Sequence, residues 1–187
     1  KYIVFVDSDD WVDLDMVEKL YNYAEQLKCD LVFCEIALFN EKNNFFYQYE
    51  WCKIPKRAKI LNNPFHWLNV YNDFYNFFTG PFGKIYRKDL LLMHKIEFPV
   101  GLFYEDSPFV YKCLLNSRKI YTIEESLYKY RFNRTGSTLT NEGKLHYHIF
   151  EIMKINKTII NEKLEYRVLN DPFIVKVIKE YIAAFMR

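Results

Sequence analysis

The stretch Tyr2-Ile3-Val4-Phe5-Val6-Asp7-Ser8-Asp9-Asp10-Trp11 decides how this chain folds. Its first half is an unbroken apolar run, which is typical of a strand covered on both faces in a parallel sheet. The run ends at a cluster of acids, and ligands of such sheets collect where the strands end. Carboxylates held together against their repulsion indicate a divalent cation, and hard oxygen ligands suit Mg²⁺ or Mn²⁺. A polar turn is the alternative, because Asp13 or Asp15 can cap the following helix.

A second acidic pair lies about a hundred residues further along the chain, in Gly101-Leu102-Phe103-Tyr104-Glu105-Asp106-Ser107-Pro108-Phe109. Pro108 suits the first turn of a helix, and the apolar residues behind it continue a helical stripe. Glu105 and Asp106 are therefore expected at a helix start. One acidic group can then hold a metal ion while the other abstracts a proton.

Periodicity predicts the remaining elements of an α/β fold. Helices are expected at 14–28, from Pro64 to 78, at 88–94, and in the tail at 145–159 and 173–185. Strands are expected at 30–39, 45–51, 83–86, 119–123 and 127–132, and the partner of the strand at 45–51 is expected near 57–61. The tail helices are expected to pack on the rest of the chain.

Composition indicates one globular unit. The chain has 187 residues, 50% hydrophobic content and a net charge of +2, so it can bury one core and has no basic patch for nucleic acid. The aromatic residues serve a core or platforms on which sugar rings stack. The four cysteines show no metal or redox spacing, which favours a reduced, cytoplasmic protein. No apolar stretch is long enough to span a membrane, although work at the inner membrane face on a lipid-linked acceptor stays open.

Four segments together carry a resemblance to a known family: residues 2–11, residues 83–91 (Gly-Lys-Ile-Tyr-Arg-Lys-Asp-Leu-Leu), residues 103–109, and residues 127–137. In order and spacing they resemble the family 2 glycosyltransferases of the GT-A fold. These are inverting enzymes that move a sugar from a nucleotide diphosphate to an acceptor hydroxyl. The resemblance implies a GT-A-like, Rossmann-like mixed sheet flanked by helices, with a helical tail, and a role in bacterial surface polysaccharide biosynthesis.

One departure from the family concerns the start of the chain. Such enzymes place a base-binding unit upstream of the DxD strand, whereas this sequence begins at that strand with Lys1. We therefore expect an N-terminally truncated chain that lacks the half that binds the nucleotide base and is inactive alone. Residues 1–140 are expected to form the C-terminal part of the catalytic domain, with the DxD strand and acceptor region, and 141–187 a helical extension.

The resemblance also implies roles for individual residues. Asp9 and Asp10 are expected to bind Mn²⁺ or Mg²⁺, and Asp7 to lie near the nucleotide ribose or in the metal's outer shell. Asp106 is expected to be the catalytic base, with Glu105 orienting the acceptor. The nucleotide sugar is the donor, and a saccharide or lipid-linked saccharide is the acceptor.

Cations near these acids are candidates for two roles. Lys84, Arg131 or the metal ion is expected to keep Asp106 ionised, and Lys84 and Arg131 are also candidate donor-binding residues. We expect Arg131 and Arg134 either to close over the diphosphate or to belong to a solvated loop. We expect His146 or His148 either to complete the metal's ligand shell or to have a structural role.

Two other function classes stay open from the sequence. A haloacid dehalogenase-like phosphohydrolase also has a DxD after a hydrophobic strand. The pattern of that class has Thr or Gly soon after the second Asp, where this chain has Asp10 and Trp11. A noncatalytic carbohydrate- or protein-binding module is favoured if the acids are helix caps and the aromatic residues form an exposed surface.

Overall fold

A single mixed sheet organises the chain. The computed structural model describes residues 1–132 and 147–185, with side chains described as far as residue 177. Within these residues the sheet has six strands in the order β1-β5-β3-β6-β2, and β4 pairs with β3 outside that path. The strands are β1 (Tyr2–Val4), β2 (Trp11–Val12), β3 (Leu31–Asn40), β4 (Phe45–Tyr47), β5 (Lys84–Arg87) and β6 (Ile120–Phe132). β3 and β6 run parallel at the centre, and the other pairs are antiparallel.

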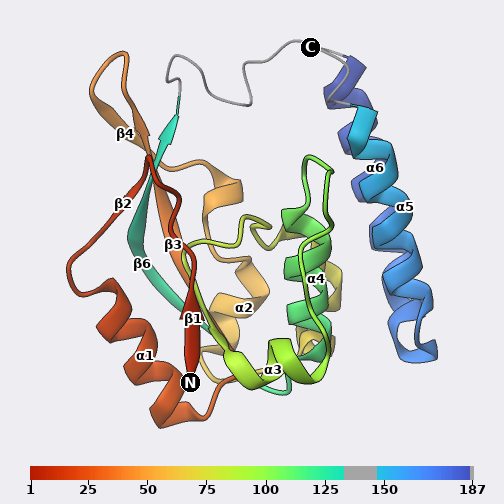
Figure 1. The fold of residues 1–187 in the computed structure, drawn as a ribbon, viewed down its shortest axis with the longest axis horizontal. Coiled ribbons are helices and arrows are strands. Elements are labelled where there is room, and N and C mark those ends of the chain that lie inside the picture. Colours follow the sequence, from red (N-terminus) through yellow and green to blue (C-terminus); the bar gives the residue numbers. More distant parts are fainter. Residues whose placement is uncertain (133–146, 186–187) are drawn as a thin grey trace.

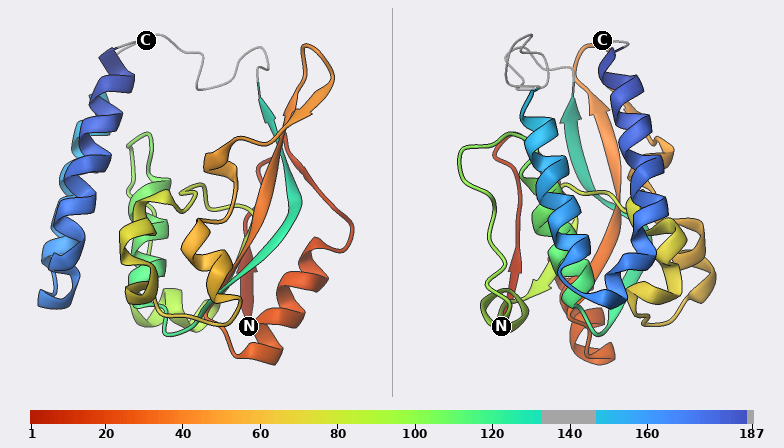
Figure 2. Two further views of the ribbon diagram at one scale, coloured as in Figure 1. Left: turned by 180° about the vertical axis from the view of Figure 1, so that it is seen from behind. Right: turned by 90° about the vertical axis from the view of Figure 1, so that its right-hand side faces the viewer.

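Helices cover both faces of this sheet (Figure 1). One face carries α1 (Met16–Leu27), and the other carries α2 (Lys56–Leu61), α3 (Lys88–Met93) and α4 (Asp106–Asn116). Beyond α4, α5 (His148–Asn161) and α6 (Asn170–Phe185) lie side by side as an outer layer (Figure 2). Short 3-10 segments complete the chain at η1 (Glu50–Cys52), η2 (Trp67–Asn76) and η5 (Leu164–Leu169). The predicted α/β fold class is confirmed.

The central strand β3 explains why the sheet is buried on both sides. Successive side chains of a strand point to opposite faces. Leu31 and Phe33 accordingly join the core beneath α4 and η2, whereas Val32 and Cys34 join the core beneath α1. The unbroken apolar sequence of β3 therefore supplies two cores at once. The predictions of this strand and of α1 are confirmed.

The first strand differs from its prediction in direction. Ile3 and Phe5 pack into one core and Tyr2 and Val4 into the other, so the expected covering of both faces is confirmed. However, β1 runs antiparallel to β5, and Val6 is 49% exposed. An apolar run indicates that a strand is buried, but it does not indicate whether the neighbouring strand runs parallel or antiparallel. The expectation of a parallel pairing is therefore wrong for β1.

Three further elements differ from their predictions. Residues 57–61 belong to α2, and β4 pairs with β3, so the predicted pairing of 45–51 with 57–61 is wrong. The strands predicted at 119–123 and 127–132 form one strand, β6, whose pairing with β3 shifts register beside Glu35. The helix predicted from Pro64 is the 3-10 segment η2, kinked at Val70.

The C-terminal helices pack on the sheet-bound helices, as expected. Ile159, Ile160, Tyr166, Leu169 and Phe173 belong to the same buried cluster as α4 and η2. The predicted boundary at residue 140 lies outside the described residues, so that division stays a proposal. In the part of the chain that the structure describes, no helix is long and apolar enough to cross a membrane.

Candidate active site

The first acidic segment is a loop between β1 and β2 that β6 anchors. The hydroxyl of Tyr128 donates to Oδ2 of Asp10 at 2.7 Å and accepts the backbone N–H of Asp7 at 3.1 Å. The backbone N–H of Arg131 donates to the other carboxylate oxygen of Asp10 at 2.8 Å. The Asp10 side chain therefore fixes the loop to the sheet, and each of its oxygens keeps accepting capacity beyond the bond it makes.

The side chain of Arg131 strengthens this anchor. Its Nε donates to the backbone carbonyl of Asp9 at 2.8 Å, and its Nη1 pairs with Glu41 at 3.0 Å. The guanidinium also lies over the ring of Trp11, 5.1 Å from its centroid. Arg131 is thus committed to the acidic loop in this structure, and a contact with a diphosphate stays a prediction.

The second acidic segment begins α4, as predicted. Asp106 is the first residue of the helix, where the helix dipole favours a negative charge. Tyr104, two residues earlier, has a φ of 68°, which is the left-handed region that non-glycine residues rarely adopt. Backbone strain of this kind clusters at functional sites, and here it turns the chain into the acidic pair.

Aromatic packing brings the two acidic segments together. Phe5, two residues before Asp7, packs edge-on against Phe109, which lies one helical turn after Asp106, with ring centroids 5.6 Å apart. Phe98 stacks on Phe109 at 4.0 Å and completes the cluster. Segments about a hundred residues apart in sequence are thereby fixed side by side, which brings the two acidic motifs close together.

The acids of the two segments influence one another electrostatically. Burial, followed by the charges of Glu105 and Asp7, raises the pKa of Asp106 to about 7. Burial also raises the pKa of Asp7, with Asp9 and Glu105 adding to the effect. Burial also raises the pKa of Asp10, and the hydrogen bonds from the backbone of Arg131 and from the hydroxyl of Tyr128 only partly offset this rise. Acidic side chains therefore gather at this edge of the sheet, where a bound cation would lower their pKa values.

Lys84 lies beneath the acids rather than among them. Its side chain is 1% exposed, and its Nζ donates to the carbonyls of Gly80 at 2.5 Å and Phe82 at 3.1 Å. Burial lowers the pKa of Lys84 to about 7, and the charge of Lys84 in turn lowers the pKa of Asp106. In this structure the carbonyls of Gly80 and Phe82 enclose the ammonium of Lys84, and its expected role in donor binding stays a prediction. The expected influence of Lys84 on Asp106 is consistent with this position.

The donor set fits a hard divalent cation only in part. Within the described residues, no group of three or more His, Cys, Asp or Glu side chains is arranged to hold a metal ion. Mg²⁺ commonly uses one or two protein carboxylates together with substrate phosphates and water. Acids of the first loop match that smaller requirement. Nδ1 of His148 accepts the N–H of Phe103 at 3.1 Å, while His146 and Arg134 lie outside the described residues.

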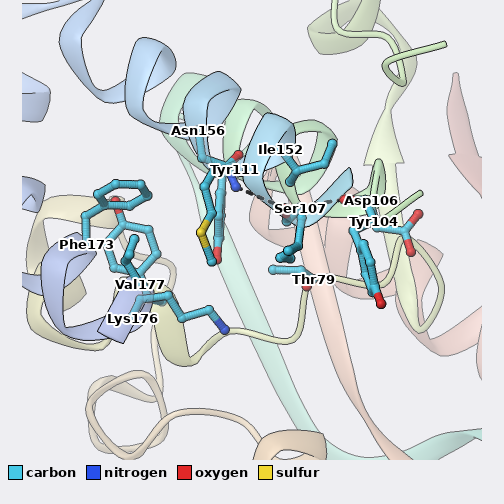
Figure 3. A pocket seen from close by; sticks show the side chains of 13 residues that line it. Thr79, Tyr104, Asp106, Ser107, Tyr111, Ile152, Asn156, Phe173, Lys176 and Val177 are labelled. Carbon is cyan, nitrogen blue, oxygen red and sulfur yellow. Dashed lines mark hydrogen bonds between the residues drawn. The ribbon is translucent and has the colours of Figure 1, made fainter. Parts of the chain in front are cut away.

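Sequence reasoning missed several residues of this site. Tyr128 and Tyr130 sit on β6, and burial followed by the charges of Asp10, Asp7, Asp9 and Asp106 raises the pKa of Tyr130. Their only signal in the sequence is a pair of tyrosines on one face of a predicted strand. A cavity of about 120 Å³ next to Asp106 was also not foreseen; residues of α4, α5, α6 and η2 line it (Figure 3).

Comparison with known proteins places this geometry in a family. The sequence profile of Glycosyl transferase family 2 matches residues 1–91. The glycosyltransferase GlyA of Streptococcus pneumoniae is 30% identical over 136 residues, which are 71% of this chain and 19% of GlyA. The glycosyltransferase GlyG of the same organism is 28% identical over 149 residues, which are 78% of this chain and 48% of GlyG. The chain thus spans less than half the length of these curated relatives.

A solved structure shows the same fold. Staphylococcus aureus TarS 1-349 in complex with UDP-GlcNAc superposes with a TM-score of 0.64 and 22% identity, covering 91% of this chain and 47% of that one. A curated sequence of TarS from that species is described as a poly(ribitol-phosphate) beta-N-acetylglucosaminyltransferase and is 24% identical over 167 residues, which are 88% of this chain and 27% of TarS. At this level of identity the structural likeness concerns the GT-A-like fold alone.

Proposed function

Because the chain belongs to glycosyl transferase family 2, with a GT-A-like fold, we propose that it transfers a sugar from a nucleotide diphosphate to an acceptor hydroxyl with inversion. The observation that carries the proposal is the position of Asp106. Its carboxylate shares one site with Asp7 and Glu105 and also lines the cavity under α5. A donor on the side of the first acidic loop and an acceptor in the cavity would meet at this carboxylate.

The proposed chemistry is a direct displacement. Asp106 accepts the proton of the acceptor hydroxyl while that oxygen forms its bond to the anomeric carbon, and the bond from that carbon to the diphosphate oxygen breaks. Glu105 orients the acceptor. Asp106 must be ionised for this step, and the buried charge of Lys84 favours the ionised form.

Asp9 and Asp10 are the proposed metal-side residues, and Asp7 is assigned to the nucleotide ribose or the outer shell. Mn²⁺ or Mg²⁺, when bound, supplies positive charge to the departing nucleoside diphosphate. Tyr128 and Arg131 hold the loop in register with Asp106 through the hydrogen bonds they make to Asp10 and Asp9. Preorganised charge of this kind does not need to reorganise during the reaction.

We assign the donor to the uridine diphosphate sugars and the acceptor to a bacterial surface saccharide, free or lipid-linked. The description of TarS bound to UDP-GlcNAc and the name of that enzyme support this assignment. The inner face of the cytoplasmic membrane is the proposed place of action if the acceptor is lipid-linked. The match to the family profile does not favour the two alternative functions, a phosphohydrolase and a noncatalytic binding module.

The proposal is tested on the full-length protein, including any base-binding segment that precedes Lys1. This protein is incubated with a panel of nucleotide sugars, and the released nucleoside diphosphate is measured with Mn²⁺, with Mg²⁺ and with a chelator. We expect release from one or a few uridine diphosphate sugars, only with metal. The Asp9→Asn variant is expected to weaken both metal and donor binding. Release that is indifferent to metal, or full activity of the variant, would contradict the assigned roles.

A further inference from the structure

Two hollows meet beside Asp106. The first, the inner cavity, has a volume of about 120 Å³ and is lined by Asp106, Ser107 and Asn156 among others. The second, the outer groove, has a volume of about 1010 Å³ and runs between η1, η2 and the start of α6. Tyr75, Thr79 and Lys176 line both. The hollows are therefore neighbours that share part of their walls.

The inner cavity contains polar atoms that lack a protein partner. Asn156 is 6% exposed and Tyr75 is 7% exposed. Within the part of the chain that the structure describes, Oδ1 of Asn156 and the hydroxyl of Tyr75 are buried without a hydrogen bond. Nδ2 of Asn156 donates to Oγ of Ser107 at 3.1 Å, which fixes the amide of Asn156 next to α4 (Figure 3). Buried polar groups are normally hydrogen-bonded by protein or by water, so these two atoms give the cavity hydrogen-bonding capacity that the protein itself does not use.

The outer groove leads to a row of aromatic rings, the aromatic ladder, formed by half-buried Tyr47 and by exposed Tyr49 and Trp51. The rings of Tyr47 and Tyr49 are parallel within 7° at 6.2 Å, and those of Tyr49 and Trp51 are parallel within 7° at 6.4 Å. Tyr49 is 47% and Trp51 48% exposed, and Trp51 itself lines the groove. Trp51 also packs against Phe78, another groove residue, at 5.4 Å.

The ladder is held in place from below. Buried Glu35 accepts Gln48 at 2.7 Å and the backbone N–H of Ile54 at 3.2 Å, so it grips the chain on both sides of Tyr49 and Trp51. Lys59 adds an ion pair to the same carboxylate at 2.7 Å. Rings fixed in this way lose little conformational entropy when a ligand stacks on them.

We propose that the C-terminal helices close an oligosaccharide-binding channel, with the terminal sugar of the acceptor in the inner cavity and the preceding sugars in the outer groove and on the aromatic ladder. Sugars combine an apolar ring face, which suits Trp51, with hydroxyl groups, which suit Asn156 and Tyr75. This inference rests on the proposed transferase function. It specifies the acceptor as an oligosaccharide of several units rather than a single sugar.

The test uses the full-length protein, including any segment that precedes Lys1. It measures binding to an array of bacterial surface saccharide fragments of one to six units, together with donor turnover by the same preparation. We expect affinity to rise with length. The double variant Tyr49→Ala/Trp51→Ala should bind the longer fragments about tenfold more weakly, because stacking on two rings is lost. The single variant Trp51→Phe keeps an aromatic ring at this position, so it should lose less affinity for the longer fragments than the double variant does.

The matched control is Tyr21→Ala, an exposed aromatic residue on α1, across the sheet from the groove. This variant should bind every fragment as the wild type does. Affinity that does not rise with length, absence of binding to any fragment, or equal losses in the control would overturn the channel. If the wild type shows no metal-dependent donor turnover, the proposed function fails; if turnover is present without length dependence, only the channel fails.

Discussion

Replacing Asp106 by Asn should stabilise the protein at neutral pH, because the carboxylate lies where its ionised form is disfavoured. The pKa of Asp106 is raised from 3.8 to about 7 by burial and by the charges of Glu105 and Asp7. Such a group contributes its full stability below the unfolded pKa of 3.8, and that contribution is lost as the pH rises through about 7. The neutral amide of Asn has no such loss.

The size of this effect follows from the pKa. A rise from 3.8 to about 7 corresponds to about 4 kcal/mol between the two protonation states. Because solvent still reaches part of the side chain, we expect about half of this, roughly 2 kcal/mol. The stability advantage of Asp106→Asn over the wild type should therefore grow between about pH 4 and pH 7 and stay constant above pH 7.

Urea denaturation across this pH range, with a chelator present, measures the difference directly. A chelator is needed because a bound cation would lower the pKa of Asp106. Glu18→Gln, which alters an exposed carboxylate on α1, serves as the matched carboxylate control. A pH-independent difference for Asp106→Asn, or one that falls as the pH rises, would refute the argument.

Further changes probe the surroundings of Asp106. Lys84→Met removes the buried charge that lowers the pKa of Asp106, so the pH at which transfer reaches half its maximum should move upward, as pH–rate profiles would show. Tyr128→Phe leaves the N–H of Asp7 without its acceptor, so it should lower the free energy of unfolding by about 1–3 kcal/mol in urea denaturation. It should also weaken metal binding in a calorimetric titration, and unchanged values of both would contradict the anchoring role. Gly83→Ala should cost more in thermal denaturation than Gly101→Ala, because both have positive φ but only at Gly83 would a Cβ meet the side chain of Ile36, at 3.3 Å; equal losses would count against that contact.

The elements that could be predicted were those with an unambiguous period and length. α1 repeats apolar residues at helical spacing over several turns, and β3 is an apolar run bounded by Asp30 and the turn at Asn40 to Asn44. Residues 57–61 are too short for period to separate a strand from a helix, and they form a helix. Pairing direction depends on residues far apart in the chain, which is why the direction of β1 was wrong.

The acidic residues of the site could be found from sequence because they end a strand and begin a helix. Their partners could not. Whether Lys84 faces a ligand or the core depends on the carbonyls of Gly80 and Phe82, which fold back over it. The bridge that Tyr128 makes between Asp7 and Asp10 exists only after β2 pairs with β6. The hollows beside Asp106 form only after α5 and α6 pack on α4.

The central claim, that Asp106 is the proton acceptor of sugar transfer, is tested most directly by measuring the transfer rate and the donor affinity of Asp106→Asn beside the wild type. The account predicts that transfer falls by about 10²–10⁴-fold, while the dissociation constant for the donor changes little. Transfer close to the wild-type rate, or a loss explained by weaker donor binding, would contradict it.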